Sequence, residues 1–88
     1  MTEKTVTVMN RAGIHARPSA MLVQITKNFK SNIYIEKGTF KINAKSIMGI
    51  ITLGAAYGTE LKITTEGEDE EAAADAVVKL FESKFEEE

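Results

Sequence analysis

The chain contains a single proline, Pro18, and its position restricts where the first helix can begin. Proline has no backbone N–H and a nearly fixed φ, so it is accepted in the first turn of a helix and disrupts a helix further in. The apolar residues after it recur about every 3.6 positions, which is typical of an amphipathic helix. We therefore predict a helix from Pro18 to about Phe29, with a buried side made of Pro18, Leu22, Ile25 and Phe29.

Four segments alternate polar and apolar residues, which predicts strands with one buried face. The first is residues 4–9, and the last is residues 60–66. The middle two, residues 32–36 and 40–43, are separated by a short turn that contains Gly38. Because glycine accepts the positive φ of a tight turn, we predict that these two strands form a hairpin.

The apolar segment 47–53 fits a short helix or a buried strand equally well by its periodicity. Ser46 before it is a good N-cap residue, and Gly54 after it can end a helix. These two flanking residues favour the helix. Such a short helix cannot bury all of its large side chains, so we expect at least one of them to face solvent.

The last helix is predicted over residues 70–83, and its buried side consists of Ala73, Val77, Leu80 and Phe81. Acidic residues at 68–71 lie at its start, where the helix dipole favours negative charge. We interpret them as a solvated helix start that needs no partner. Residues 86–88 are expected to be a frayed tail.

The order of these elements, β-α-β-β-α-β-α, predicts an α+β fold of the open-faced β-sandwich type. Four short strands with one apolar face each predict an antiparallel sheet that is open to water on one side. The two longer helices would cover the other side. The chain has no linker, internal repeat or low-complexity segment, so we expect residues 1–88 to form a single domain.

The composition excludes several kinds of site. The chain has no cysteine, which rules out disulfides, thiolate nucleophiles and cysteine-based metal sites. Its single histidine cannot build a histidine-rich metal centre. No apolar run approaches the ~20 residues of a membrane-spanning helix, and residues 2–5 are too polar for a secretory leader. We therefore expect a cytoplasmic protein that inserts into no membrane.

The net charge of −2 is unevenly distributed along the chain. Residues 1–65 carry nine Lys or Arg against three Glu, whereas residues 66–88 carry two Lys against ten Asp or Glu. The basic part contains the only histidine, so its charge favours phosphate groups and acidic protein partners. A pI of about 5.4, and the lack of a motif that combines basic and aromatic residues, argue against nucleic-acid binding.

The histidine, His15, lies at or just before the start of the first predicted helix. Free backbone N–H groups and the positive end of the helix dipole favour an anion there. Arg17 adds a guanidinium group suited to phosphate oxygens, and a neutral imidazole is a usable nucleophile. These residues predict a histidine that accepts a phosphoryl group. The alternative is that His15 only caps the helix and Arg17 is solvated.

Two motifs, GIHARP at residues 13–18 and NAKSIMGI at residues 43–50, resemble those of the HPr family. This is the family of histidine-containing phosphocarriers of the bacterial sugar phosphotransferase system. The resemblance covers essentially the whole chain and implies the HPr fold, an open-faced β-sandwich. One departure is Ser19, where the family motif commonly has alanine.

The resemblance implies that His15 takes a phosphoryl group on Nδ1 from phospho-enzyme I and passes it to sugar-specific IIA domains. Arg17 and the backbone amide of Ala16 would hold the phosphate oxygens. Ser46 matches a serine phosphorylated by HPr kinase/phosphorylase, and the phosphoserine form would bind a LacI-type catabolite regulator. No metal or cofactor is implied, and a monomer would suit two alternating partners.

We also expect a docking surface for these partners around the site. Ala20, Ile47 and Met48 are the candidates for an apolar patch, and Arg17 and Lys27 for its basic rim. The alternative for Ile47 and Met48 is burial under the sheet.

Two other functions compete with the carrier. A regulatory binding module would act through phosphorylated Ser46 and would not use His15; the family's regulatory paralogue lacks this histidine, so its presence here favours a carrier. A small hydrolase would need a second catalytic group near His15, and the sequence offers none. The Ser46 motif also favours the sugar branch of the family over a nitrogen-branch relative.

Overall fold

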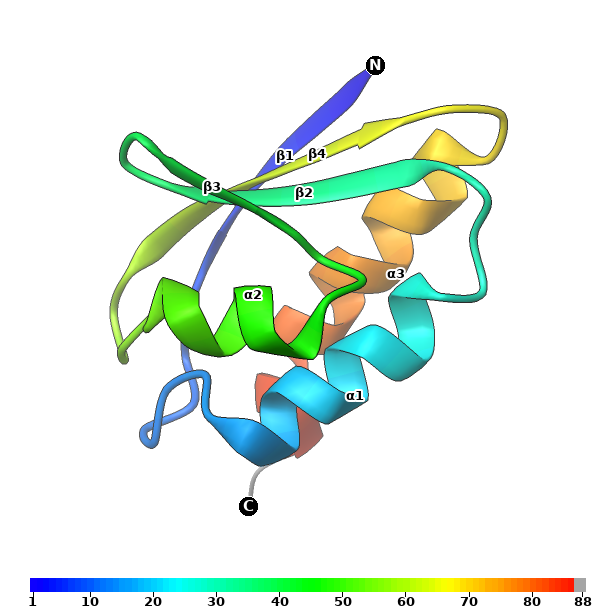
Figure 1. Ribbon diagram of the computed structural model, residues 1–88. Helices are drawn as coiled ribbons and strands as arrows, with labels where there is room; N and C mark the ends of the chain where they lie inside the picture. Colours follow the sequence, from blue (N-terminus) through cyan, green and yellow to red (C-terminus); the bar gives the residue numbers. More distant parts are fainter. Residues whose placement is uncertain (87–88) are drawn as a thin grey trace.

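The elements of the computed structural model, which describes residues 1–86, follow the predicted order (Figure 1). The strands are β1 (Thr2–Thr7), β2 (Asn32–Lys37), β3 (Phe40–Asn43) and β4 (Glu60–Glu66). The helices are α1 (Ala16–Thr26), α2 (Ile47–Leu53) and α3 (Glu70–Glu82), and a 3₁₀ turn, η1 (Lys84–Glu86), follows them.

The four strands form one antiparallel sheet in the order β1-β4-β2-β3. All three helices lie on one face of this sheet and leave the other face open (Figure 1). Helix α3 packs on β1 and β4, α2 packs on β3, and α1 contacts both α2 and α3. The predicted fold class is confirmed, and the short helix α2 joins the two longer helices in covering the sheet.

The core lies between the sheet and the helices, and the strands contribute alternating residues to it: Val6 of β1, Ile33 and Ile35 of β2, Ile42 of β3, and Leu61 and Ile63 of β4. Ile63 of β4, for example, is fully buried and pairs with Ile35 of β2. The predicted buried side of the last helix is confirmed. The four residues of that side, Ala73, Val77, Leu80 and Phe81, are all buried. Leu22, Ile33, Ile50 and Leu61 are buried core residues of the other elements.

Helix α1 begins two residues before Pro18, which is its third residue, and ends at Thr26 and not near Phe29. After Thr26 the amides of Asn28 and Phe29 bond to carbonyls three positions back, so the last turn tightens and the α-helix stops. Phe29 still packs against the core, partly buried.

The first strand also ends earlier than predicted, at Thr7. Val8 leaves the ladder with β4, but its amide still donates to the Thr59 carbonyl at 2.9 Å, and its side chain is fully buried. The apolar alternation therefore continues beyond the regular strand.

The C-terminal turn η1 was not predicted. Its residues Lys84, Phe85 and Glu86 all have positive φ, between 54° and 58°, which is unfavourable for residues with a side chain. Phe85 is 1% exposed and packs edge-on against Phe81, with ring centroids 4.9 Å apart. Burial of this ring offsets the strained backbone. Residues 87–88 of the expected frayed tail lie outside the described residues.

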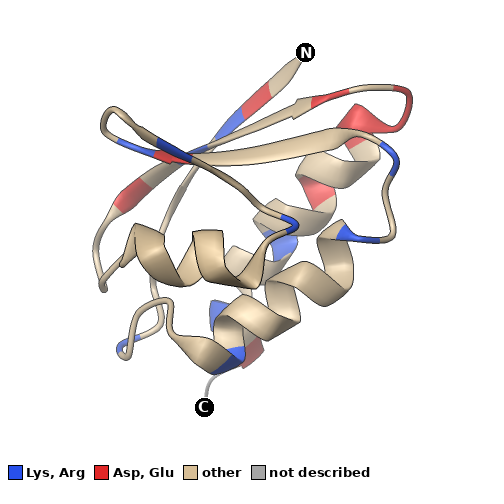
Figure 2. Cartoon of the chain, in the orientation of Figure 1, with Lys and Arg blue, Asp and Glu red and all other residues tan. Residues whose placement is uncertain are grey.

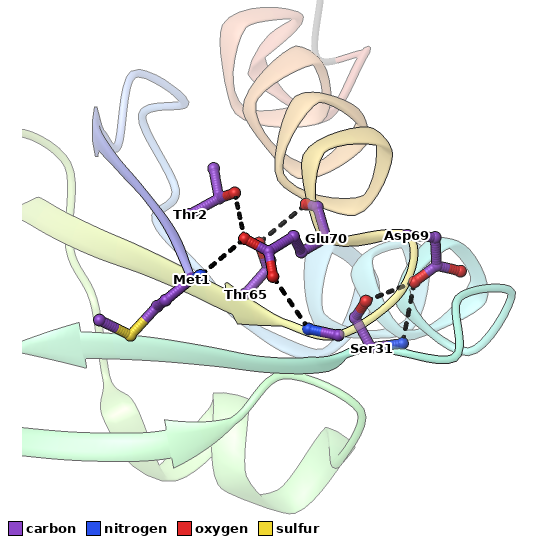
Figure 3. Close-up of polar contacts among 7 residues, drawn as sticks. Met1, Thr2, Ser31, Thr65, Asp69 and Glu70 are labelled. Carbon is purple, nitrogen blue, oxygen red and sulfur yellow. Dashed lines mark hydrogen bonds and ion pairs between the residues drawn. The ribbon is translucent and has the colours of Figure 1, made fainter.

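Two of the four acidic residues at the start of α3, Asp69 and Glu70, have specific partners, so the interpretation of a solvated helix start that needs no partner was wrong for these two. Asp69 is the N-cap of α3, but its side chain makes no capping bond. Instead it accepts hydrogen bonds from the Ser31 amide, at 2.9 Å, and from the Ser31 hydroxyl (Figure 3). The Lys30 amide donates to the same carboxylate at 2.9 Å. Asp69 therefore joins the start of α3 to the connection between α1 and β2.

Glu70 makes a second set of contacts, with the N-terminus of the chain (Figure 3). Its carboxylate lies 2.9 Å from the Met1 amino group and accepts a hydrogen bond of 2.7 Å from the Thr2 hydroxyl. The Gly67 amide donates to the same carboxylate at 3.1 Å. Glu70 thus fixes the first residues of the edge strand β1 to α3.

These contacts predict a loss of stability in acid. The hydrogen bonds from Ser31 and Lys30 lower the pKa of Asp69 from 3.8 to about 2, and those from the N-terminus and Thr2 lower that of Glu70 from 4.5 to about 2. Their contribution is therefore complete above about pH 5 and lost as the pH falls towards 2. We expect the melting temperature to fall over this range.

The Asp69→Asn variant should show a smaller fall in melting temperature between pH 5 and pH 2 than the wild type, because one of the two titrating contacts is gone. Asp75→Asn is a matched control, since Asp75 is an exposed carboxylate on the same helix. Equal pH profiles for wild type and Asp69→Asn would contradict the role of Asp69.

Candidate functional site

A tight turn at residues 10–13 leads the chain into His15. The Gly13 amide donates to the Asn10 carbonyl at 3.0 Å, and the Asn10 side-chain amide donates to the Gly13 carbonyl at 2.6 Å. Gly13 has φ +76°, and a Cβ atom there would lie 2.9 Å from the Ala55 carbonyl oxygen. Only glycine fits this position without displacing the neighbouring backbone.

The segment before His15 is bonded to the loop between α2 and β4. The Ile14 amide donates to the Ala55 carbonyl at 2.8 Å, and the Gly58 amide donates to the Val8 carbonyl at 2.7 Å. The Val8 amide in turn donates to the Thr59 carbonyl at 2.9 Å. The backbone on the N-terminal side of His15 is therefore held to a second segment of the chain at several points.

His15 is the N-cap of α1, with an extended backbone (φ −117°, ψ −158°). Its carbonyl accepts hydrogen bonds from both the amide and the hydroxyl of Ser19, at 2.9 and 2.7 Å. The imidazole is exposed and makes no capping hydrogen bond. The ring is thus open to a partner while its backbone is fixed.

The first residues of α1 provide the groups expected to hold an anion. Ala16 and Arg17 are exposed, and the amides of a first helical turn have no partner within the helix. Pro18, the next residue, is buried, and because proline has no backbone N–H it leaves no unpaired donor in this turn. A helix start of this kind stabilises an exposed anion by only ~0.3–1 kcal/mol, so it can receive a phosphoryl group and release it again.

Ser46 is the N-cap of α2, as predicted, and its hydroxyl accepts a hydrogen bond of 3.1 Å from the Gly49 amide. Gly54 ends the helix in the left-handed conformation, with φ 61° and ψ 38°. The helix interpretation of residues 47–53 is therefore confirmed, and the strand alternative is wrong.

Helices α1 and α2 run in opposite directions, so Ser46 and His15 lie at opposite ends of the pair (Figure 1). The end of α1 is bonded to the start of α2: the Thr26 hydroxyl donates to the Ala44 carbonyl at 2.8 Å, and Lys45 Nζ to the Phe29 carbonyl at 2.7 Å. With 11 residues, α1 is about 16 Å long.

Three large apolar side chains of α2 face solvent. Met48 is 69% exposed, Ile47 is 42% exposed and Ile51 is 39% exposed, whereas Ile50 and Leu53 are buried. Burial of Ile47 and Met48 under the sheet, the alternative in the sequence analysis, is therefore wrong. On the neighbouring helix, Ala20 is half-buried, and Lys27 is exposed at the C-cap, the end that is bonded to the start of α2.

Basic and acidic residues are spread over the molecule, with one concentration of acidic residues (Figure 2). Acidic residues gather where β4 leads into α3, and Arg17 lies in the first turn of α1, at the other end. Within residues 1–86, no three His, Asp or Glu side chains are arranged to hold a metal ion. In the same part of the chain, no helix is long and apolar enough to cross a membrane.

The sequence analysis did not predict the contacts of two buried polar side chains near His15, Asn10 and Ser19, which are 1% and 0% exposed. Asn10 is the first residue of a turn that ends in glycine, a pattern typical of β-turns, so its turn could have been found. The contact of Ser19 could not be found in this way. A serine inside a helix can either face solvent or bond to the carbonyl four residues back, and the sequence does not distinguish the two.

Comparison with known proteins agrees with the fold and this site. The family model for the PTS HPr component phosphorylation site matches residues 2–83. Phosphocarrier protein HPr of Treponema pallidum is 51% identical over 88 residues, which are 100% of each chain. HPr-like protein Crh of Halalkalibacterium halodurans is 43% identical over 84 residues, 96% of this chain and 100% of Crh.

A solved structure extends the similarity to three dimensions. The crystal structure of HPr-C-His from Thermoanaerobacter tengcongensis matches with a TM-score of 0.96 at 51% identity, over 100% of this chain and 99% of that one. The similarity therefore includes every element around His15. From its sequence and its fold alike, this chain belongs to the HPr family of the phosphotransferase system.

Proposed function

We propose that this chain is a stoichiometric phosphocarrier that accepts a phosphoryl group on His15 from phospho-enzyme I and passes it to sugar-specific IIA domains. The observation that supports this most is the exposed His15 imidazole, which makes no capping hydrogen bond at the start of a helix, in a chain of the HPr family. In this proposal the carrier works as a monomer in the cytoplasm, with the same site free for each partner in turn.

The transfer is an in-line exchange between two histidines. The lone pair of neutral His15 Nδ1 forms the new N–P bond while the N–P bond on enzyme I breaks, and Nε2 keeps its proton. Arg17 and the amides of Ala16 and Arg17 stabilise the charged oxygens, so the work is positioning and charge stabilisation. The second transfer, to the IIA domain, repeats the exchange with His15 as the leaving group.

Incubation with enzyme I and phosphoenolpyruvate should give one acid-labile phosphate per chain, and His15→Ala should give none. Arg17→Ala should slow the transfer by about tenfold or more, since a charge-assisted contact with the phosphate is lost. Circular dichroism should show both variants folded, because both side chains are exposed. A phosphate that persists in His15→Ala would contradict the assignment.

The partners dock, in this proposal, on the exposed residues of α2 and α1: Ile47, Met48 and Ile51, next to Ala20, with Arg17 and Lys27 at the two ends of α1. This arrangement has the apolar centre and charged rim of a transient interface. Enzyme I and the IIA domains would use the same surface in turn.

Met48→Ala should weaken binding to enzyme I by about threefold to tenfold and leave the melting temperature unchanged, because the side chain is 69% exposed. Ile50→Ala is the contrasting variant on the same helix. Its side chain is fully buried, so it should lose about 2–5 kcal/mol of folding stability and bind normally while folded. Titration calorimetry and thermal melts separate the two effects. Equal affinity of Met48→Ala and wild type would remove Met48 from the interface.

We also propose that phosphorylation of Ser46 by HPr kinase/phosphorylase regulates the carrier through this docking surface. Ser46 and His15 lie at opposite ends of the α1–α2 pair, and α1 is about 16 Å long. Exposed charges this far apart are largely screened, since the Debye length is about 8 Å at physiological salt. A phosphate on Ser46 would therefore act on the partner that docks beside Ile47, and not on the His15 chemistry.

Ser46→Asp should raise the KM of enzyme I for the carrier by about tenfold, with little change in kcat or in the melting temperature. Thr39→Asp, which adds the same charge at the exposed β2–β3 turn, should leave both kinetic constants unchanged. Ser46→Ala should lose about 1 kcal/mol of stability, as the cap is removed, and transfer normally. An unchanged KM in Ser46→Asp would refute the electrostatic account.

A second candidate is a regulatory function through phosphorylated Ser46, with a LacI-type regulator as partner. The similarity to the HPr-like protein Crh supports it only weakly, and the carrier function fits better. The regulatory function is compatible with the carrier function, because the two modifications occupy opposite ends of the pair α1–α2. The phosphorylation assay on His15→Ala and Ser46→Ala separates the two functions.

A further inference from the structure

We infer that Asn10 and Ser19 are positioning residues that hold the His15 backbone from both sides and so aim its imidazole for phosphoryl transfer. This inference rests on the proposed function of His15. The two side chains, together named the His15 clamp, are the polar groups buried closest to His15 in the sequence, at 1% and 0% exposure. Neither touches solvent, so neither can bind a partner directly.

The N-terminal half of the clamp is Asn10. Its backbone carbonyl accepts from the Gly13 amide at 3.0 Å, and its side-chain amide donates to the Gly13 carbonyl at 2.6 Å. Both polar groups of Gly13 are therefore bonded to one residue. Asn10 Oδ1 accepts no hydrogen bond from the described part of the chain, so the side chain acts on the turn through its donor alone.

The C-terminal half is Ser19. Its hydroxyl and its amide both donate to the His15 carbonyl, at 2.7 and 2.9 Å. A hydroxyl bond to the carbonyl four residues back is common in helices. Here the acceptor belongs to the N-cap residue that carries the reacting ring, so the bond restrains the ψ angle of His15 itself.

Between these two halves, the Ile14 amide donates to the Ala55 carbonyl at 2.8 Å. The Gly13 amide and carbonyl, the Ile14 amide and the His15 carbonyl are thus all bonded, while the imidazole makes no capping hydrogen bond. A fixed backbone with a free ring suits in-line transfer, because small misplacements of a nucleophile reduce the rate strongly. The clamp supplies orientation that the exposed ring cannot obtain from contacts of its own.

The test uses Ser19→Ala, Asn10→Ala and the control Thr65→Val in the full chain. Thr65 is 0% exposed and its hydroxyl donates to the Glu70 carbonyl at 2.8 Å, so the control removes a bond of the same kind at the other end of the molecule. Two readouts are measured: the kcat and KM of enzyme I for each carrier, and the hydrogen exchange of the Ile14 amide relative to that of Ile63.

We expect Ser19→Ala and Asn10→Ala to lower kcat by about threefold to tenfold with KM unchanged, and to speed Ile14 exchange relative to Ile63. Thr65→Val should change neither readout. Wild-type kcat in both clamp variants, or an equal loss in Thr65→Val, would overturn the inference. If Asn10→Ala does not fold, the kcat and the Ile14 exchange of Ser19→Ala alone test the inference.

The exchange readout separates this inference from the proposed function. A wild-type chain that takes no phosphate from enzyme I would contradict the proposed function. The clamp would then be judged on Ile14 exchange alone, and unchanged exchange in Ser19→Ala would overturn it.

Discussion

The hydrogen bond from the Ile14 amide to the Ala55 carbonyl joins the segment before α1 to the segment after α2. It requires glycine at position 13, where a Cβ atom would meet the same carbonyl. This contact places the start of one helix beside the end of the other, and the antiparallel pair follows from it. The exposed apolar side chains of α2 and the basic residues at both ends of α1 then share one surface.

The same arrangement separates two chemistries on a small domain. His15 and Ser46 are the N-caps of two antiparallel helices and lie at opposite ends of the pair. Helix α1 is about 16 Å long, which exceeds the Debye length of about 8 Å in physiological salt. In the proposed function, a phosphate on either residue would therefore be largely screened from the other. A partner that covers both helices would sense both phosphates, so the proposed carrier and regulatory functions would meet at the proposed docking surface.

Local patterns were enough to predict the strand and helix order, because each element has its own periodicity and its own cap. The N-cap Ser46 and the left-handed Gly54 decided between helix and strand at residues 47–53, where periodicity could not. Long-range contacts were not predictable in this way. Asp69 resembles an ordinary helix cap in the sequence, yet it bonds to Ser31, and Phe85 is buried through a strained turn that no local preference favours.

The central claim concerns one atom, Nδ1 of His15, and the position of phosphorus on the ring tests it most directly. After incubation of the carrier with enzyme I and phosphoenolpyruvate, ¹⁵N–³¹P couplings in the NMR spectrum identify the nitrogen that carries the phosphorus. The account predicts a coupling to His15 Nδ1. Phosphorus on Nε2, on another residue, or on no residue at all would contradict it.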